Sequence, residues 1–170
     1  MSLALDRINR AGAAEAESIF RDCCGSPEWS KRMAASRPFD SEDALMQTAA
    51  DVWNDLQAFD WLEAFAAHPK IGETKPVSTR QKQSEEWSAR EQAGMSMATE
   101  RVQNELAAAN RDYYAKFGFI FIVCATGKTA DEMLELCRSR MSNDLEMEIG
   151  VAAAEQQKIT ELRLRKLLSL

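Results

Sequence analysis

The sequence predicts an all-α fold, a single multihelical domain over residues 1–170 with one short buried extended segment. Three observations lead to this class. Ala, Glu, Leu, Gln and Met, which favour helices, are abundant, and only seven glycines and four prolines interrupt the chain. Apolar residues recur at helical spacing over most of the length. One run alone is rich in β-branched and aromatic residues, and a single extended segment cannot form a sheet. A length of 170 residues suits one domain with a sizeable core.

The first expected helix covers residues 12–24, where the apolar side chains fall on one face. Gly25 and Pro27 follow it, and both residue types mark helix ends. Trp29 and Met33 lie four residues apart and indicate a second, short helical segment.

A break is expected at Arg37-Pro38, because a residue before proline is disfavoured in helical geometry. Ser41 is placed to cap the helix that follows. The stripe of that helix consists of Leu45, Thr48, Val52, Leu56 and Phe59. A further helical segment, residues 60–67, then ends at His68-Pro69.

Residues 69–86 form the longest predicted loop, since they are polar and contain Gly72 and Pro76. Loops of this length without internal structure are usually functional or mobile. After this loop, residues 98–116 are expected to form a helix. Its stripe consists of Val102, Leu106, Ala109 and Tyr113.

Residues 119–125 are predicted to be the buried extended segment, because they are β-branched and aromatic in character. Thr129 and Glu132 fit a capping box that opens the next helix. The last helix is expected over residues 144–168. One side of it consists of Leu145, Ile149, Ala152, Ile159 and Leu162.

Charge and hydropathy exclude several classes of protein. Lys and Arg number 21 and Asp and Glu 27, so the net charge is −6 and the pI is near 5.0. A nucleic-acid-binding protein would need a basic face, which this balance does not offer. No apolar run approaches the ~18 residues of a membrane span. The N-terminus lacks a secretory signal pattern, and Leu168-Ser169-Leu170 is not a peroxisomal address, so a cytoplasmic location is expected.

Cysteine and histidine set further limits. The four cysteines (Cys23, Cys24, Cys124 and Cys137) form no C-x-x-C motif, so they are expected to be buried thiols in a reducing compartment. His68 is the one histidine, so a two-histidine metal site within one chain is impossible, and no metal site is predicted.

His68 and the stretch around Glu91 are the first two candidate sites. His68 lies where a helix stops, just before Pro69 and the polar loop, and is either a structural residue or a general acid/base. Ser88 and Glu91 fit a capping box, and with Gln92 they equally suit the binding of a small polar ligand. Both readings can hold together.

Two further candidates lie in the C-terminal half. Gly127-Lys128 is similar to part of a phosphate-binding loop, but Ile122 occupies the position where that motif needs a glycine. The backbone amides and carbonyls of residues 121–125 must be satisfied by some partner, and a ligand is one candidate. Arg163 falls four residues after Ile159, on the face expected to be buried, where an arginine typically pairs with a carboxylate of the protein or of a substrate.

Six motifs in a fixed order resemble those of the 2-oxo-4-hydroxy-4-carboxy-5-ureidoimidazoline (OHCU) decarboxylases, over nearly the whole chain. They are Cys23-Cys24-Gly25-Ser26 with Trp29, Arg37-Pro38-Phe39, His68-Pro69-x-Ile71-Gly72, Trp87-Ser88-x-x-Glu91-Gln92, Phe117-Gly118-Phe119-x-Phe121-Ile122-x-Cys124-Ala125, and Ile159-Thr160-x-x-Arg163-Leu164. Enzymes of this family complete the conversion of urate to (S)-allantoin.

The resemblance implies an all-α homodimer that uses no metal or organic cofactor, acts on OHCU, and works together with a hydroxyisourate hydrolase and a urate-oxidising enzyme. It implies that His68 is the catalytic acid/base, Glu91 its acidic partner and Arg163 the basic residue of the pocket. The implied substrate contacts are Pro69, Ser88, Ala89, Arg90, Glu91 and Gln92, and the backbone of Phe121, Ile122, Val123, Cys124 and Ala125.

The chemistry of this substrate agrees with the absence of a cofactor motif. Its carboxylate is attached to a carbon next to a ring C=N, so the electrons left by carbon dioxide flow into the ring nitrogen. Two alternatives stay open: a helical module that binds ureido compounds without catalysis, and an enzyme of the same fold with another ureido or imidazole substrate.

Overall fold

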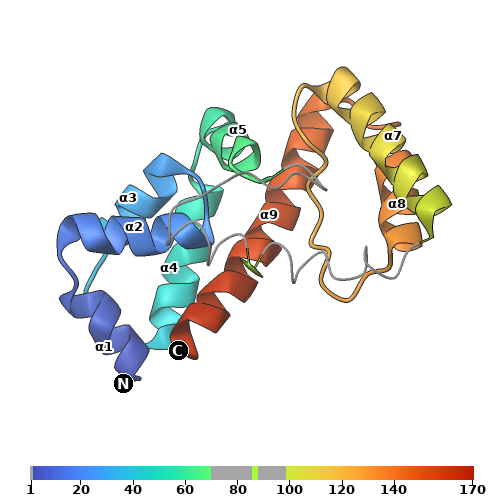
Figure 1. Cartoon of the computed structure of the whole chain (residues 1–170). Coiled ribbons are helices and arrows are strands. Elements are labelled where there is room, and N and C mark those ends of the chain that lie inside the picture. The colour runs from blue at the N-terminus through green and yellow to red at the C-terminus, as the bar shows by residue number, and fades with distance from the viewer. Residues whose placement is uncertain (1, 70–85, 88–98) are drawn as a thin grey trace. The chain divides into compact units, whose positions relative to one another are not determined.

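A computed structural model describes residues 2–69, 86–87 and 99–170 (Figure 1). These residues form eight helices and no strand, so the all-α prediction is confirmed. The helices are α1 (Leu3–Arg10), α2 (Ala13–Cys23), α3 (Pro27–Ala35), α4 (Glu42–Asn54), α5 (Ala58–Ala66), α7 (Glu100–Phe117), α8 (Ala130–Arg140) and α9 (Leu145–Leu168). In the described part of the chain, no helix has the length and apolar character of a membrane span.

The chain divides into two compact units. Unit 1 comprises Met1–Ala67 and Gln157–Leu170, and unit 2 comprises His68–Gln156. The helix α9 contributes to both units. The single domain expected over residues 1–170 stays a prediction.

Hydroxyl side chains begin most of the helices. Ser41 accepts a hydrogen bond from the Ala44 amide, and Thr129 forms the expected capping box with Glu132, so both predicted caps are confirmed. Ser26 and Thr99 cap α3 and α7 in the same way. These caps satisfy amides that have no partner within the helix.

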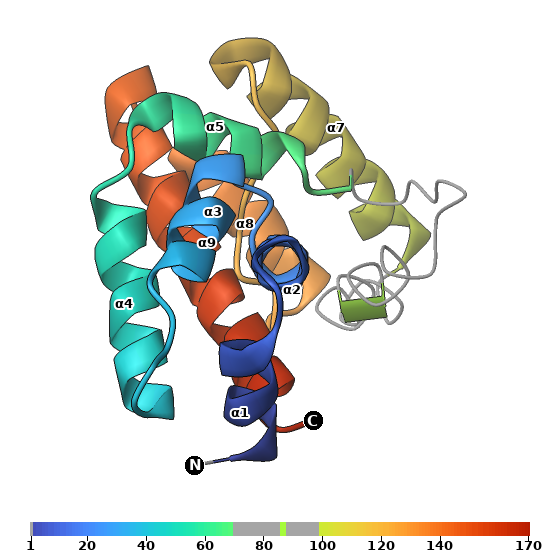
Figure 2. The same cartoon turned by 90° about the vertical axis from the view of Figure 1, so that its left-hand side faces the viewer.

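Unit 1 is built around α3, which contacts α2, α4 and α5, while α1 lies against α2 (Figure 2). At its centre the Phe20 and Trp29 rings meet edge to face, with centroids 6.0 Å apart. The fully buried Trp29 indole donates a hydrogen bond of 3.1 Å to the carbonyl of Ala49. This bond attaches α3 to α4 and satisfies the indole N–H.

The Arg37-Pro38-Phe39 motif has a structural role in unit 1. The Arg37 guanidinium donates hydrogen bonds to the carbonyls of Ala34, Ile8 and Ala11, at 2.8, 2.8 and 2.6 Å. These carbonyls lie at the ends of α3 and α1, where the helix leaves them without partners. The Arg37 side chain therefore caps the C-termini of two helices.

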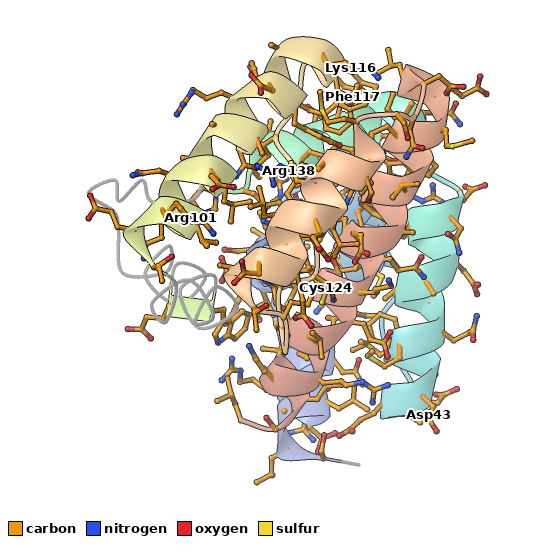
Figure 3. The ribbon with its side chains drawn as sticks, turned by 90° about the vertical axis from the view of Figure 1, so that its right-hand side faces the viewer. Asp43, Arg101, Lys116, Phe117, Cys124 and Arg138 are labelled. Carbon is orange, nitrogen blue, oxygen red and sulfur yellow. The ribbon has the colours of Figure 1, made fainter. Side chains whose placement is uncertain are left out.

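In unit 2, α7 packs along α8, and the ion pair between Arg138 and Glu105 (3.0 Å) joins their exposed faces (Figure 3). An apolar cluster fills the space between them, formed by Val102, Leu106, Ala125, Ala130, Met133 and Leu134. The predicted helices 98–116 and 144–168 agree with α7 and α9 to within two residues.

Three expectations about the helices were wrong or incomplete. The stripe assigned to one helix up to Phe59 is divided, because α4 ends at Asn54 and a capping box between Gln57 and Asp60 starts α5. As a result, Phe59 is 68% exposed. Leu145, expected on the buried side of the last helix, is 52% exposed. The helix α1 had no counterpart in the predicted elements.

Candidate active site

His68 lies directly after α5, at the beginning of unit 2, with its side chain half-buried. Its Nε2 atom forms a hydrogen bond with Oε1 of Gln156, which lies on α9. The Gln156 side chain is completely buried, at 0% exposure. The one imidazole of the chain is therefore held by an amide inside the core of unit 2.

Residues 119–125, predicted to be a buried extended segment, contain neither helix nor strand. Phe121, Ile122, Cys124 and Ala125 are buried, whereas Val123 is half-buried. Such a segment has no neighbouring strand to pair with its peptide groups, so other partners must satisfy them.

Three charged side chains bind the backbone of this segment. Arg140 donates to the Ile122 carbonyl at 2.6 Å, and Lys128 donates to the Cys124 carbonyl at 2.8 Å. The Cys124 amide donates to Glu155 at 3.2 Å. Lys128 of the apparent phosphate-loop sequence thus has a structural role here.

Consecutive residues of α9 hold two of the predicted site elements. Glu155 accepts from the Cys124 amide and Gln156 bonds to His68. Within unit 2, α9 therefore sets the positions of both the imidazole and the extended segment.

A buried charge cluster supports the same segment. The Arg140 guanidinium lies 2.5 Å from the carboxylate of Glu148, which is 0% exposed, and the Tyr113 hydroxyl donates to that carboxylate at 2.5 Å. Burial and then the bond to Glu148 raise the pKa of Tyr113. Arg140 also lies 4.7 Å from the ring centroid of Phe121. The cluster fixes the guanidinium that binds the Ile122 carbonyl.

Arg163 lies in unit 1 and is 5% exposed, so the predicted burial of this arginine is confirmed. It is close enough to Cys23 and Cys24 to affect both thiols. Burial raises the pKa of Cys24 to about 11, and bonds with Ser26 and Thr160 and the Arg163 charge oppose this shift. Burial likewise raises the pKa of Cys23, again against the Arg163 charge.

All four cysteines are buried and free of disulfides, as predicted. The buried thiols of Cys23 and Cys24 are therefore protonated at neutral pH, which makes them poor nucleophiles.

The remaining predicted contacts fall largely outside the described residues. These are Ser88, Ala89, Arg90, Glu91 and Gln92. Pro69 is exposed, and Trp87, next to this stretch, is 7% exposed. The pairing of His68 with Glu91 stays a prediction. Among the residues described, no group of His, Cys, Asp and Glu side chains has the arrangement of a metal site.

Gln156, Glu155 and Arg140 were not among the residues predicted for the site. Gln156 had a detectable signal, because it stands four residues after Ala152 and three before Ile159, within the apolar stripe of α9. A polar residue at such a position requires a buried partner. The partners of Glu155 and Arg140 are too distant in sequence for any spacing argument.

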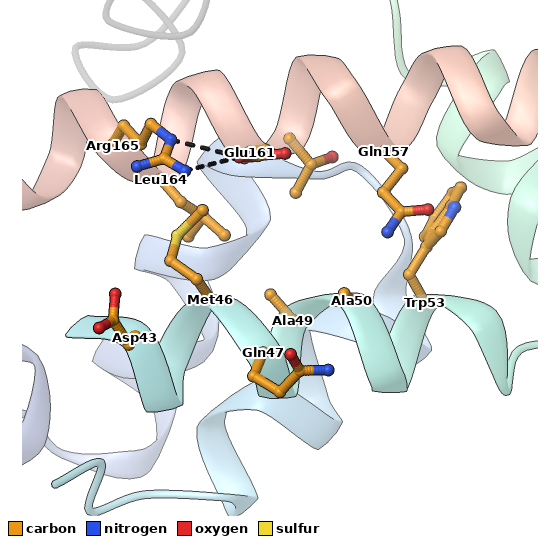
Figure 4. Close-up of a pocket in the computed structure, with 11 residues that line it drawn as sticks. Asp43, Met46, Gln47, Ala49, Ala50, Trp53, Gln157, Glu161, Leu164 and Arg165 are labelled. Carbon is orange, nitrogen blue, oxygen red and sulfur yellow. Dashed lines mark hydrogen bonds and ion pairs between the residues drawn. The ribbon is translucent and has the colours of Figure 1, made fainter. Parts of the chain in front are cut away.

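Unit 1 also contains a pocket of about 310 Å³ between α4 and α9 (Figure 4). Met46 and Leu164 come from the two facing helices, and the Glu161–Arg165 ion pair lies at one end. None of the predicted site residues lines this pocket.

Comparison with known proteins assigns the family. A family model described as OHCU decarboxylase matches residues 9–165. The chain belongs to the OHCU decarboxylase family. The family predicted from the six motifs is therefore confirmed.

Relatives within and around this family differ in length. A uric acid degradation bifunctional protein of Arabidopsis thaliana is 42% identical over 90% of this chain, which spans 47% of that protein. An OHCU decarboxylase of Halalkalicoccus jeotgali is 27% identical over 97% of this chain and 92% of its own length. This chain thus spans less than half of the Arabidopsis protein and nearly all of the Halalkalicoccus one.

A solved OHCU decarboxylase, crystallised in the presence of (S)-allantoin, matches with a TM-score of 0.77 and 40% identity. The match covers 90% of this chain and 99% of that structure. A structure of (S)-allantoin synthase shares the fold, with a TM-score of 0.71 at 17% identity.

Proposed function

We propose that this chain decarboxylates OHCU to (S)-allantoin without a cofactor, as a carboxy-lyase of urate breakdown. The observation that carries the proposal is the match to a solved OHCU decarboxylase over 99% of its length at 40% identity. The chain's one imidazole, bonded to a fully buried side chain, supports a role that needs a fixed proton carrier.

In the proposed reaction the bond between the carboxylate and ring carbon C4 breaks, and carbon dioxide leaves. The electron pair of that bond forms a C4=C5 double bond, and the electrons of the former C=N end on the ring nitrogen, which takes up a proton. The C4 hydroxyl then gives up its proton as C5 gains one, and His68 either takes the hydroxyl proton during carbon dioxide loss or protonates the intermediate at C5. Protonation from one fixed face produces the (S) configuration.

Glu91 and Arg163 are proposed to assist His68. Glu91 would orient and charge the imidazole, and Arg163 would neutralise negative charge and hold the ligand. The burial of Arg163, at 5% exposure, supports this role, because a guanidinium out of water binds a carboxylate more strongly than an exposed one does. The backbone of residues 121–125 is proposed as a further ligand contact, and Arg140, Lys128 and Glu155 hold it in place through the Ile122 carbonyl and the Cys124 carbonyl and amide.

The test is a stereochemical assay. Hydroxyisourate is generated enzymatically together with its hydrolase, and the optical activity of allantoin is followed with and without this protein. Because the substrate also decays spontaneously, optical activity separates catalysis from background decay. Rapid formation of (S)-allantoin is the expected result.

The variant that tests the catalytic role of the histidine is His68→Asn. It should slow (S)-allantoin formation by at least about 100-fold, since general acid/base catalysis contributes about 10²–10⁴-fold. Its far-UV circular dichroism should stay native. Turnover near the wild-type rate would reject the role of the histidine.

A non-catalytic module for ureido compounds is the alternative. It predicts that calorimetry detects allantoin binding to the wild type while carbon dioxide release is not accelerated. The homodimer, the cytoplasmic location and the link to a hydroxyisourate hydrolase and a urate-oxidising enzyme stay predictions.

A further inference from the structure

We infer that Gln156 is a positioning residue for His68, which fixes the orientation and the tautomer of the imidazole. The inference rests on the proposed function, because it gives Gln156 a part in the same reaction. It starts from one contact, in which the Gln156 Oε1 atom meets the Nε2 atom of His68.

The position of Gln156 makes it a rigid support. The residue lies within the 24-residue helix α9, next to the buried Ala152 and Ala153 on one side and Ile159 and Thr160 on the other. Its side chain is fully buried, and a buried amide left without hydrogen bonds is destabilising. The bond to His68 therefore helps to satisfy the amide as well as to hold the ring.

The orientation of the Gln156 amide sets the tautomer that we infer. With the amide oxygen facing the ring, the Nε2 atom of His68 is the donor and carries the proton, because an amide oxygen only accepts hydrogen bonds. In the neutral imidazole the basic lone pair is then on Nδ1. A ring held in this form offers one defined nitrogen for proton transfer.

The choice of an amide over a carboxylate has a chemical consequence. A carboxylate at residue 156 would stabilise the charged imidazolium and raise the pKa of the ring. The neutral amide orients the ring without adding charge, and the adjacent carboxylate of Glu155 is engaged by the Cys124 amide. Gln156 thus orients the His68 ring without favouring its charged form.

The chain contains one histidine, so its ring resonances can be assigned without ambiguity in a ¹⁵N spectrum. The wild-type protein should show Nε2 as the protonated nitrogen and Nδ1 as the unprotonated one at high pH. Gln156→Met, which keeps the length but removes the amide acceptor, should give a mixture of tautomers. Its kcat should fall about 10- to 100-fold, as for a misplaced catalytic group, while KM changes far less.

Gln156→Glu provides the second measurement. The carboxylate still accepts from Nε2, so the tautomer should persist, but the pKa of His68 should rise by about one unit or more. The acidic limb of the kcat profile should move upward with it. Gln157→Met is the control, because this neighbouring residue faces the pocket between α4 and α9, and neither the ring spectrum nor kcat should change.

The outcomes distinguish this inference from the proposed function. An active wild type whose tautomer and kcat are unchanged in Gln156→Met overturns the inference alone. A wild type that binds allantoin without forming it overturns the proposed function, and the inference with it. If Gln156→Met fails to fold, the pKa shift and altered pH profile of Gln156→Glu still decide, and their absence would reject the inference.

Discussion

Replacement of Gly25 by alanine should disturb the end of α5, directly before His68. A Cβ atom at residue 25 would lie 2.2 Å from the Cβ of Ala67, whereas the next nearest atoms lie 3.6 and 3.7 Å away. Gly25 does not have a positive φ, so an alanine there is strained by this contact and not by its backbone conformation. The tight approach gives a physical reason for glycine in the Cys23-Cys24-Gly25-Ser26 motif.

The structure sets the size of this effect. Carbon atoms pack at about 3.5–4.0 Å, so the two Cβ atoms must separate by about 1.3 Å or more. Neither atom is the end of a flexible side chain, so the backbone has to move. Overpacking of this kind costs about 1–3 kcal/mol. For a chain of this length the melting temperature should fall by about 2–12 °C.

The assay combines thermal unfolding with the rate of (S)-allantoin formation. Gly25→Ala should lower both, because the displaced Ala67 immediately precedes His68. The double variant Gly25→Ala/Ala67→Gly removes the clashing Cβ and should recover most of the stability. Gly150→Ala is the control. A Cβ on Gly150 meets nothing within 4 Å, and in the interior of α9 alanine should stabilise by about 1 kcal/mol.

Two results would refute this reasoning. A Gly25→Ala protein as stable as the wild type would show that the backbone of the linker before α3 can shift without a loss of stability. Equal destabilisation in Gly25→Ala and in the double variant would show that the loss does not come from the contact with Ala67.

Two further predictions concern buried groups. Glu148→Gln should reduce the free energy of unfolding by about 3–5 kcal/mol in chemical denaturation, since it leaves the buried Arg140 without its counter-charge. The control Glu161→Gln, which breaks the exposed pair with Arg165, should change this free energy by less than about 1 kcal/mol. Similar losses in both variants would contradict the argument. The pKa of Cys24 rises from 9.0 to about 11 on folding, so the unfolded chain releases this proton first and stability should fall as the pH rises from 9 to 11. Compared with Cys24→Ala, the wild type should lose up to about 1.4 kcal/mol more per pH unit in that window, and parallel pH profiles for the two proteins would exclude such a shift.

Local signals explain which elements of the fold were predictable. Ser41, and Thr129 with Glu132, were recognised as caps because a cap depends on residues within three positions of one another. The boundary before α5 was predicted too late in the chain, between Phe59 and Asp60, because the apolar period continues through Leu56 to Phe59 while Gln57 and Asp60 start a new helix. Periodicity describes a face of a helix but does not show where one helix ends and another begins.

Non-local contacts explain what the sequence left open in the candidate site. His68 was a visible candidate as the lone histidine, but its partner Gln156 lies 88 residues away. Glu148 is a carboxylate whose burial depends on Arg140 and on Tyr113, 35 residues distant. The contacts of Glu148 join α7, α8 and α9, and the His68 bond joins the chain after α5 to α9, so no spacing along one helix encodes them.

The division of the chain has a consequence for how the protein is made. Unit 2 is one continuous stretch, whereas unit 1 needs the segment Gln157–Leu170 to complete it. Leu164 and Leu167, in that segment, are 0% and 6% exposed. During synthesis, helices α1 to α5 therefore leave the ribosome with the apolar surface that this segment covers still exposed. About 90 more residues must be synthesised before the segment can cover it. We expect nascent chains stalled before residue 157 to be more protease-sensitive in their first 67 residues than the released protein.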